Sequence, residues 1–254
     1  TCTTTNITGD IEETQDSHIL ARDKAHPRTH FQRRAYNMLL AHRAPNPTDR
    51  CRKKMLRWEL QDPMKHPPPE GTSSKHNTPA WQARRCLANI QVLSKLVPPR
   101  VCAATFGTTW NRWCTRRRYQ QRHLSTNKCM LGCEGNAEDS LEHYCRCPVT
   151  QRILQSNLNM SPSKYANMHT FLLCNAHIRT LEELIAIALL QYALYNATNH
   201  FRHHPPTSTT DHYEATVQWL REGAKKHNKA TDALDNRWNP HAHKTPLPPI
   251  PWNI

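Results

Sequence analysis

Hydrophobic positions recur at helical spacing along much of the chain, and residues 181–200 show the pattern most clearly. Apolar residues recur there every three or four positions, as on one face of an amphipathic helix. Thr180 and Glu183 have the spacing of a capping box, so the pattern predicts a helix that begins at Leu181. The apolar stripe consists of Leu181, Leu184, Ile185, Ala188, Leu189, Tyr192 and Tyr195.

Similar spacing predicts further helices, which prolines separate. Proline fits the first turn of a helix but not its interior, so Pro79 marks a start, whereas Pro45 and Pro98 mark ends. Asp49 is a candidate N-cap for a short basic helix. No internal repeat or strand ladder is evident, and the predicted fold class is therefore mainly α. The predicted helical ranges are 19–43, 49–60, 78–96, 100–122, 149–158 and 211–227.

Composition adds a strong charge imbalance to this helical pattern. The 254 residues include 34 Lys and Arg against 20 Asp and Glu, which gives a formal net charge of +14. Such a surplus is typical of proteins that bind polyanions, although a basic protein without a nucleic-acid role is the alternative. The apolar fraction is 37%, below the roughly 45–50% of globular domains even when glycine is added. We therefore expect a thin core and segments that gain order from a partner.

The ends of the chain and its apolar runs bear on location. No apolar run approaches the roughly 18 residues that span a bilayer, and no secretory signal pattern is present, so no membrane partner is expected. The sequence begins at Thr1. A cleaved organellar transit peptide is one explanation, and a fragment or a further N-terminal tail are the others.

One group of cysteines has the spacing of a metal site. Cys129, Cys133, His143 and Cys147 form the pattern Cys-x3-Cys-x9-His-x3-Cys. Zinc takes four soft or borderline donors in a tetrahedron, and two close pairs can supply them. Gly132 can adopt the positive φ of a turn between the first pair. A short helix capped by Ser140 or Asp139 would place His143 and Cys147 on one face, four residues apart.

Alternatives to this ligand set remain. Cys145 could replace Cys147 as the fourth ligand. However, Cys145 is only two residues from His143, and on a helix the two side chains would point in different directions. Separate thiols and a surface histidine are the other interpretation, but four of the ten cysteines lie within 19 residues. A closed Cys3His site is structural, since it leaves no position for a catalytic water. The other cysteines are expected to be small buried hydrophobes: Cys2, Cys51, Cys86, Cys102, Cys114 and Cys174.

Polar and Pro-rich stretches divide the chain into segments. A run of prolines at 67–69, followed by Gly71, is incompatible with a helix and predicts a linker. Five prolines within 239–254 predict an extended tail close to polyproline II. The expected architecture is a small zinc-stabilised helical core with long extended basic and Pro-rich arms. Its segments are an N-terminal arm with basic helices (1–62), a Pro-rich linker (63–79), a helical domain (80–202) with its zinc unit (127–150), a C-terminal helix (203–238) and the tail (239–254).

The cysteine segment also resembles a known family. The stretch Glu138-Asp-Ser-Leu-Glu-His143 and the closing Cys147-Pro-Val149 are similar to the zinc-binding region that follows the polymerase of non-LTR retrotransposon reverse transcriptases. Upstream, 97–101 and 110–119 resemble the thumb-side stretch, so that the resemblance covers roughly residues 95–202. A reverse transcriptase needs paired aspartates to hold Mg²⁺, and the sequence contains no Asp-Asp pair. The resemblance therefore implies nucleic-acid binding without polymerisation.

Basic and aromatic residues are interleaved before the cysteines. Residues 112–122 contain five arginines and no acidic residue. Arginines can contact phosphates while aromatic rings stack on unpaired bases, and Trp113 is expected to be buried. The predicted RNA-binding residues are Arg112, Arg116, Arg117, Arg118, Tyr119, Arg122, Arg52, Lys53, Lys54, Arg84 and Arg85.

Together these features predict a non-catalytic RNA-binding component of a large ribonucleoprotein that contains Zn²⁺. An organellar, mitochondrial ribosome is the expected particle, with ribosomal RNA and neighbouring proteins as partners and no small-molecule substrate. The chain would then derive from the C-terminal region of a retroelement reverse transcriptase. The alternative is the nucleic-acid-binding fragment of an active non-LTR reverse transcriptase.

Overall fold

The computed structural model describes residues 46–115, 118, 128–133, 137–204 and 209–238. The chain divides into two compact units, Thr1–Pro47 and Thr48–Ile254, and nearly all described residues belong to the second. The N-terminal arm, the helix predicted over 19–43 and the Pro-rich tail over 239–254 lie outside the described residues.

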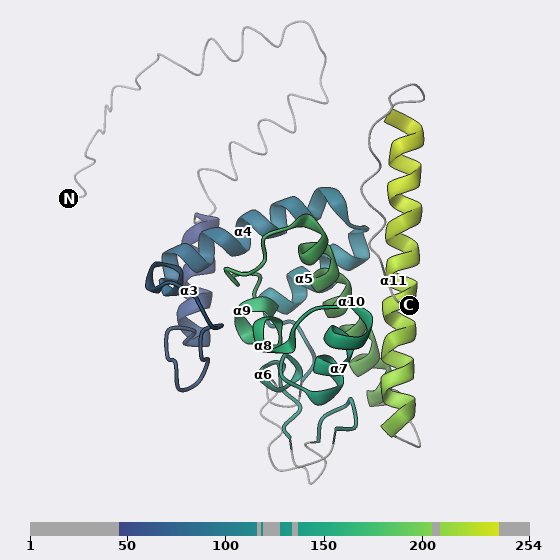
Figure 1. The fold of residues 1–254 in the computed structure, drawn as a ribbon, viewed down its shortest axis with the longest axis horizontal. Helices are drawn as coiled ribbons and strands as arrows, with labels where there is room; N and C mark the ends of the chain where they lie inside the picture. Colours follow the sequence, from purple (N-terminus) through teal and green to yellow (C-terminus); the bar gives the residue numbers. More distant parts are fainter. Residues whose placement is uncertain (1–45, 116–117, 119–127, 134–136, 205–208, 239–254) are drawn as a thin grey trace, which may run out of the picture. The chain divides into compact units, whose positions relative to one another are not determined.

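The described part of the chain is mainly helical, as the pattern predicts (Figure 1). Its only β pairing is an isolated bridge between Lys128 and Glu138. No helix in this part is long and apolar enough to cross a membrane. The helices are α3 (Pro47–Trp58), the 3-10 helix η2 (Ser74–Asn77), α4 (Pro79–Leu96), α5 (Pro99–Thr109), α6 (Leu141–Tyr144), α7 (Pro148–Asn157), α8 (Pro162–Tyr165), α9 (Met168–Phe171), α10 (Leu181–His203) and α11 (Thr209–Trp238).

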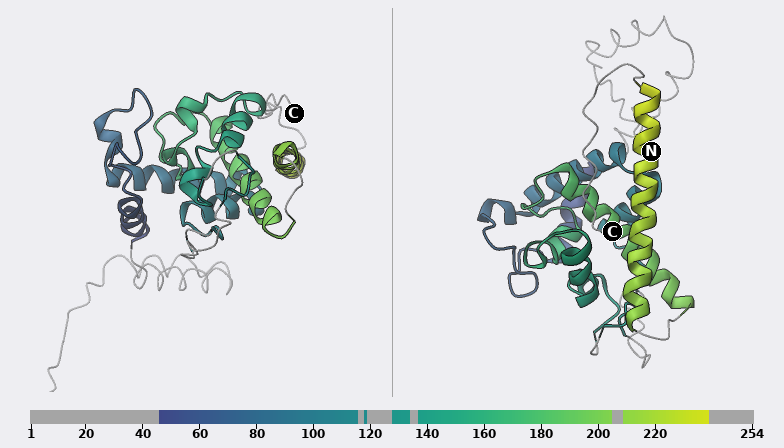
Figure 2. Two further views of the ribbon diagram at one scale, coloured as in Figure 1. Left: turned by 90° about the horizontal axis from the view of Figure 1, so that it is seen from below. Right: turned by 45° about the vertical axis from the view of Figure 1, so that its right-hand side comes forward.

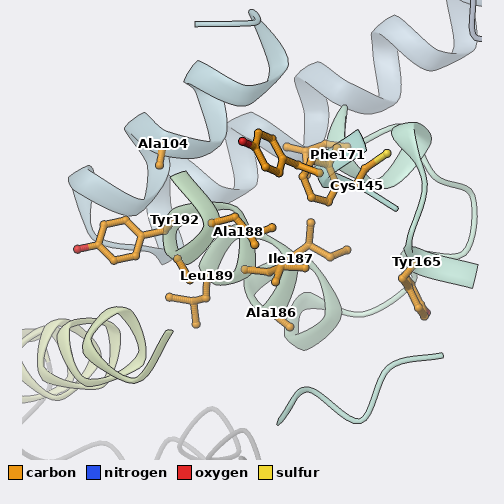
Figure 3. Close-up of a cluster of buried hydrophobic side chains, with 14 of the residues drawn as sticks. Ala104, Cys145, Tyr165, Phe171, Ala186, Ile187, Ala188, Leu189 and Tyr192 are labelled. Carbon is orange, nitrogen blue, oxygen red and sulfur yellow. The ribbon is translucent and has the colours of Figure 1, made fainter. Parts of the chain in front are cut away.

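Helix α10 forms the centre of the core. Its predicted capping box is confirmed, because Thr180 accepts a hydrogen bond from the Glu183 amide and the Glu183 carboxylate accepts one from the Thr180 amide. The predicted one-sided stripe is too narrow, since every residue from Leu184 to Leu194 is buried, whereas Leu181 is 45% exposed. The helix packs against both α5 and α11, so its apolar surface is needed on more than one face (Figures 1 and 2). In Figure 3 its side chains lie between Ala104 of α5 and Phe171 of α9.

Other helix boundaries follow their capping chemistry. Thr78 caps α4 and accepts a hydrogen bond from the Trp81 amide, as expected for Pro79 in the first position. Helix α3 begins at Pro47, two residues before the predicted cap Asp49, because proline fits a first turn. Helix α7 matches the helix predicted over 149–158 to within one residue at each end. Helix α11 extends beyond both ends of the helix predicted over 211–227.

The single helix predicted over 100–122 is wrong, because residues 110–115 are not helical. α5 ends at Thr109, and Asn111 adopts a φ of 53°, a left-handed conformation that asparagine tolerates. The turn brings Trp113 into the core, where its indole donates to the Thr108 hydroxyl at 2.9 Å. The Trp113 ring lies 5.6 Å from that of Tyr144, close to the predicted zinc unit. Burial of this tryptophan, which the sequence predicts, thus takes precedence over continuation of the helix.

The residues expected to form a linker contact the rest of the unit. They include η2, and Gly71 takes a φ of 77° at a turn. The His177 imidazole donates to the Glu70 carbonyl at 2.7 Å, and Asn77 accepts from Gln82 of α4 at 3.2 Å. Within 63–79, η2 therefore contacts α4, and Glu70 contacts the loop that precedes α10.

Buried His169 predicts a specific loss of stability in acid. Burial and, after it, the nearby charges of His66 and Arg146 together lower the pKa of this imidazole to about 4. The unfolded chain, with an ordinary histidine pKa of about 6.5, binds this proton more tightly, so stability falls as pH drops from 6.5 toward 4. Between pH 7 and pH 5 we expect a loss of about 2 kcal/mol in the free energy of unfolding from this group.

Urea denaturation at both pH values, in zinc-saturated buffer, measures this loss. The variant His169→Leu removes the titrating group and should show a pH dependence smaller by that amount. An identical pH dependence in the two proteins would mean that His169 is protonated in the folded state without cost.

Candidate metal centre

The structure brings the four predicted ligands into one cluster. The ligand atoms of Cys129, Cys133, His143 and Cys147 all lie within 4.8 Å of one another. The sulfurs of Cys129 and Cys147 are 3.9 Å apart, and the Cys133 sulfur lies 3.3 Å from His143 Nε2. Zinc bonds of about 2.3 Å to sulfur and 2.1 Å to nitrogen give tetrahedral edges of about 3.8 and 3.6 Å. Donor types and spacing therefore both suit a zinc ion.

A tight turn positions the first cysteine pair. Gly132 has a φ of 66°, as predicted, and its amide donates to the Cys129 carbonyl at 3.2 Å. The Leu131 amide donates to the Cys129 sulfur at 3.3 Å, a contact that would stabilise a thiolate. A side chain on Gly132 would place Cβ 2.4 Å from Cδ2 of His212. Glycine is therefore required here by both the backbone conformation and the close approach of α11.

The second ligand pair is built differently from the prediction. Ser140 caps α6 and accepts from the His143 amide at 3.2 Å, as expected. Placing His143 and Cys147 on one continuous helix face is wrong, because α6 ends at Tyr144 and Cys147 is the N-cap of α7. The turn between the helices still brings both ligand atoms into the cluster.

The position of Cys145 decides between the two alternative ligand sets. Its buried sulfur donates to the Glu142 carbonyl at 3.1 Å, and it lies outside the cluster. Among the remaining cysteines, Cys114 is exposed and Cys102 partly exposed, contrary to expectation, and Cys2 is outside the described residues. Cys51, Cys86 and Cys174 are buried as expected.

The surroundings of Cys129 and Cys133 disfavour the thiolate forms of these two residues unless a cation is bound. Burial and, after it, neighbouring Cys129 together raise the pKa of Cys133 to about 11. The contact with Cys147 raises the pKa of Cys129, and burial adds to this effect. A bound dication would stabilise the thiolates and release their protons, as in other thiolate metal sites.

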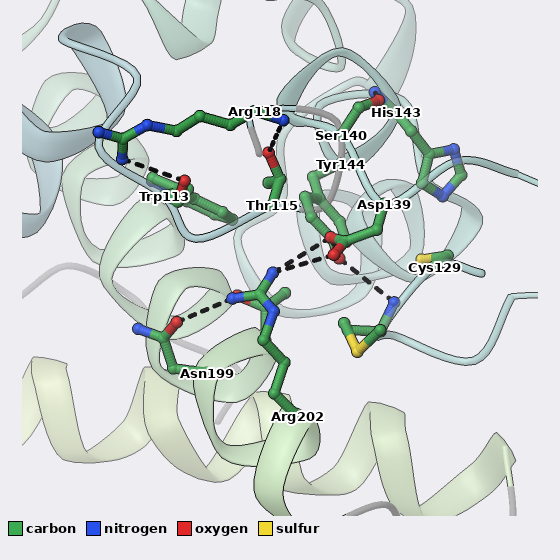
Figure 4. Close-up of polar contacts among 12 residues, drawn as sticks. Trp113, Thr115, Arg118, Cys129, Asp139, Ser140, His143, Tyr144, Asn199 and Arg202 are labelled. Atoms are coloured by element: carbon green, nitrogen blue, oxygen red, sulfur yellow. Dashed lines mark hydrogen bonds and ion pairs between the residues drawn. The ribbon is translucent and has the colours of Figure 1, made fainter. Parts of the chain in front are cut away.

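A buried polar network joins the cysteine turn to α10 (Figure 4). The Tyr144 hydroxyl accepts from the Met130 amide at 3.2 Å and donates to the Asp139 carboxylate at 2.5 Å. Arg202 of α10 donates to both oxygens of Asp139, at 3.1 and 3.3 Å. Asp139 is fully buried, so this ion pair fixes the cluster to the core. Sequence patterns do not reveal Arg202, because it is 63 residues from its partner.

Basic residues gather on α3. Cys51, Met55 and Trp58 form the buried face of α3. The cations Arg50, Lys53 and Arg57 of this helix are exposed, and Lys54 is half-buried with its ammonium 5.3 Å from the centroid of the Trp58 ring. We call these four the α3 basic face: Arg50, Lys53, Lys54 and Arg57. The charges of Arg57 and Arg118 contribute to lowering the pKa of Lys54, after burial, so these three cations lie close together. The charge of Glu142, the residue before His143, also acts on Lys54, so Lys54 lies within electrostatic range of α6.

The other predicted RNA-binding residues have mixed positions. Arg84 and Arg112 are exposed, whereas Arg85 donates to the Ile178 carbonyl and Arg52 lies 3.9 Å from Asp49. Further exposed arginines, outside the predicted set, are Arg50, Arg57 and Arg100. Outside the described residues are Arg116, Arg117, Tyr119 and Arg122.

Comparison with known proteins adds no relative to this picture. No model of a known protein family matches the chain, and neither curated proteins nor solved structures give a match. The resemblance of residues 95–202 to reverse transcriptases therefore stays a prediction, and the function must be argued from the cluster and its surroundings.

Proposed function

We propose that this chain is a non-catalytic RNA-binding protein in which a structural zinc ion holds part of a basic surface in place. The observation that carries the proposal is the Cys3His cluster in a chain that exposes cations on α3 and at Arg118. The proposed zinc ligands are Cys129, Cys133, His143 and Cys147.

The metal would be structural for two reasons. Four protein ligands complete the tetrahedral shell of zinc, so no position is left for a reacting water. The cluster also joins chain segments with little regular structure, since the Cys129–Cys133 turn and the four-residue α6 have few hydrogen bonds of their own. In such segments the free energy of metal binding serves as folding energy.

The link between the metal and the basic surface runs through Trp113. This tryptophan packs against Tyr144 of α6, and the Arg118 guanidinium donates to the Trp113 carbonyl at 3.3 Å. Arg118 in turn lies near Lys54 of α3. A zinc ion that orders α6 would therefore also fix Arg118 beside the α3 basic face, where a phosphate backbone could be bound.

The proposed setting is a large ribonucleoprotein, with a mitochondrial ribosome as the first candidate. It is supported by the net charge of +14 and the Pro-rich terminal segment. The sequence resemblance supports the alternative, an RNA- or DNA-binding part of a retroelement enzyme. The molecules that copurify with the chain distinguish these two settings. Ribosomal RNA would support the ribosome, and a retroelement polymerase or its target DNA would support the retroelement enzyme.

Salt dependence tests the RNA-binding proposal itself. Each neutralised phosphate on a single strand contributes about 0.7 to the slope of log affinity against log salt. Replacing Lys54, Arg57 and Arg118 together by alanine should lower this slope by about two for unrelated RNA sequences. Fluorescence anisotropy with labelled RNA at several KCl concentrations measures it.

A matched variant controls for net charge. Lys95, Lys164 and Lys225 are exposed cations on other elements, and their replacement by alanine removes the same charge. The control should change the slope by much less. Equal slopes in the two triple variants would mean that RNA contacts the chain through general charge, and not through the surface formed by the α3 basic face and Arg118.

A further inference from the structure

A cavity of about 490 Å³ lies between α5, α10 and α11, and its lining includes none of the four residues of the cysteine cluster. Pockets for small ligands typically have volumes of about 300–1,000 Å³, so a single nucleotide is within the range it can hold. Cations and large aromatic side chains dominate its lining. They are Arg100, Arg112, Tyr192, Tyr195, Trp219 and Lys226.

The charge of the cavity is positive. Arg100 and Arg112 are exposed at the cavity, and neither forms an ion pair within the described part of the chain. Arg112 lies over the Phe106 ring, 5.2 Å from its centroid. Lys226 is partly neutralised, because Glu222 lies 3.6 Å away. Two arginines without carboxylate partners favour an anionic group such as a phosphate.

The aromatic side chains that line the cavity come from α10 and α11, which approach each other closely. A Cβ on Gly223 would lie 3.0 Å from the Tyr192 ring, so glycine allows α11 to approach α10 at this point. Trp219 and Lys226, one turn before and one after Gly223, share its side of α11 and therefore reach the cavity. The Lys226 ammonium also donates to the Tyr192 hydroxyl at 3.2 Å. Trp219 and Tyr195 remain only partly buried and can offer ring surface to a ligand.

We infer that this cavity is a single-nucleotide site, in which an unpaired base stacks on Trp219 or Tyr195 and its phosphate binds Arg100 and Arg112. Planar bases stack on aromatic side chains with little dependence on sequence, and cations beside them track the backbone. The inference deepens the proposed function and rests on it, because an extruded base of single-stranded RNA is the expected occupant. A base inside a duplex cannot enter such a cavity, so the site would distinguish single from double strands.

The test uses the full chain loaded with zinc and a labelled ten-nucleotide oligo(A) RNA. Trp219→Ala should weaken binding about 10-fold or more, while affinity for a short RNA duplex stays unchanged. Ala103→Trp fills the cavity from an exposed position on α5 without removing any ligand contact, and should weaken single-strand binding similarly. Trp81→Ala on α4 is the matched aromatic control and should retain full affinity. Thermal melting of each variant tests whether the substitution leaves the fold intact.

Competition with adenosine monophosphate shows whether the cavity binds a free nucleotide or a base within an RNA strand. Displacement of the RNA from the unmodified protein, but not from Trp219→Ala, assigns the cavity to a free nucleotide. Trp219-dependent RNA binding without displacement assigns it to a base within a strand. Unchanged single-strand affinity in both Trp219→Ala and Ala103→Trp would overturn the inference. The proposed function would survive that result if the variant of Lys54, Arg57 and Arg118 still binds RNA more weakly, and would fail if the unmodified protein binds no RNA.

Discussion

Replacing Cys147 by serine should remove the bound zinc and unfold the region around α6. Serine oxygen is a poor zinc ligand, and the remaining donors would leave the tetrahedral shell incomplete. Structural zinc in isolated finger peptides contributes about 10–16 kcal/mol of apparent binding free energy, so even a fraction of this exceeds most single substitutions. We expect a zinc content close to zero by elemental analysis and a large fall in the melting temperature.

Cys145 provides the matched control for this substitution. It lies two residues from Cys147 and is equally buried, but its sulfur lies outside the cluster. Cys145→Ser should therefore retain one equivalent of zinc and most of the stability. Loss of zinc from Cys145→Ser with retention in Cys147→Ser would show that the ligand set is wrong.

Replacing Asp139 by alanine should destabilise the fold by about 3–5 kcal/mol, the usual cost of removing one partner from a buried ion pair. The Arg202 side chain is only 16% exposed and would lose its carboxylate partner. The Tyr144 hydroxyl would lose its acceptor in the same step. Urea denaturation of the zinc-loaded protein measures the difference in free energy of unfolding.

An exposed ion pair serves as a control, because it shows how much stability is lost when a carboxylate is removed from the surface instead of from the core. Lys65 and Glu59 form an exposed pair, and such pairs contribute about 0–1 kcal/mol, so Glu59→Ala should have little effect. In a double-mutant cycle, Asp139→Ala combined with Arg202→Leu should cost less than the sum of the single changes. Additive costs would mean that the two side chains do not depend on each other.

Local signals in the sequence predict the metal ligands and the main helix starts. The spacing of Cys129 and Cys133, the turn glycine, Pro79 in the first turn of α4 and the caps at Ser140 and Thr180 all act within a few residues. Each of these features is present in the structure. Local chemistry is sufficient there because a cap or a turn is decided by neighbouring backbone groups.

Features that depend on distant contacts could not be predicted in this way. The helix after Pro99 stops at Thr109 because Trp113 is buried against Tyr144 and Tyr195, both far along the chain. Arg202 was not identified because its role depends on Asp139 in another element. The cavity likewise requires three helices to be packed before its arginines and rings meet. Tertiary packing, which one-dimensional patterns do not encode, decides these features.

Binding of a labelled single-stranded RNA before and after zinc chelation tests the central claim most directly. If zinc positions Arg118 beside the α3 basic face, chelation should weaken binding and lower the salt slope, and added Zn²⁺ should restore both. The variant of Lys54, Arg57 and Arg118 should lose this sensitivity to chelation. Equal affinity and equal salt slope with and without zinc would contradict the account, because the metal would then have no part in forming the RNA-binding surface.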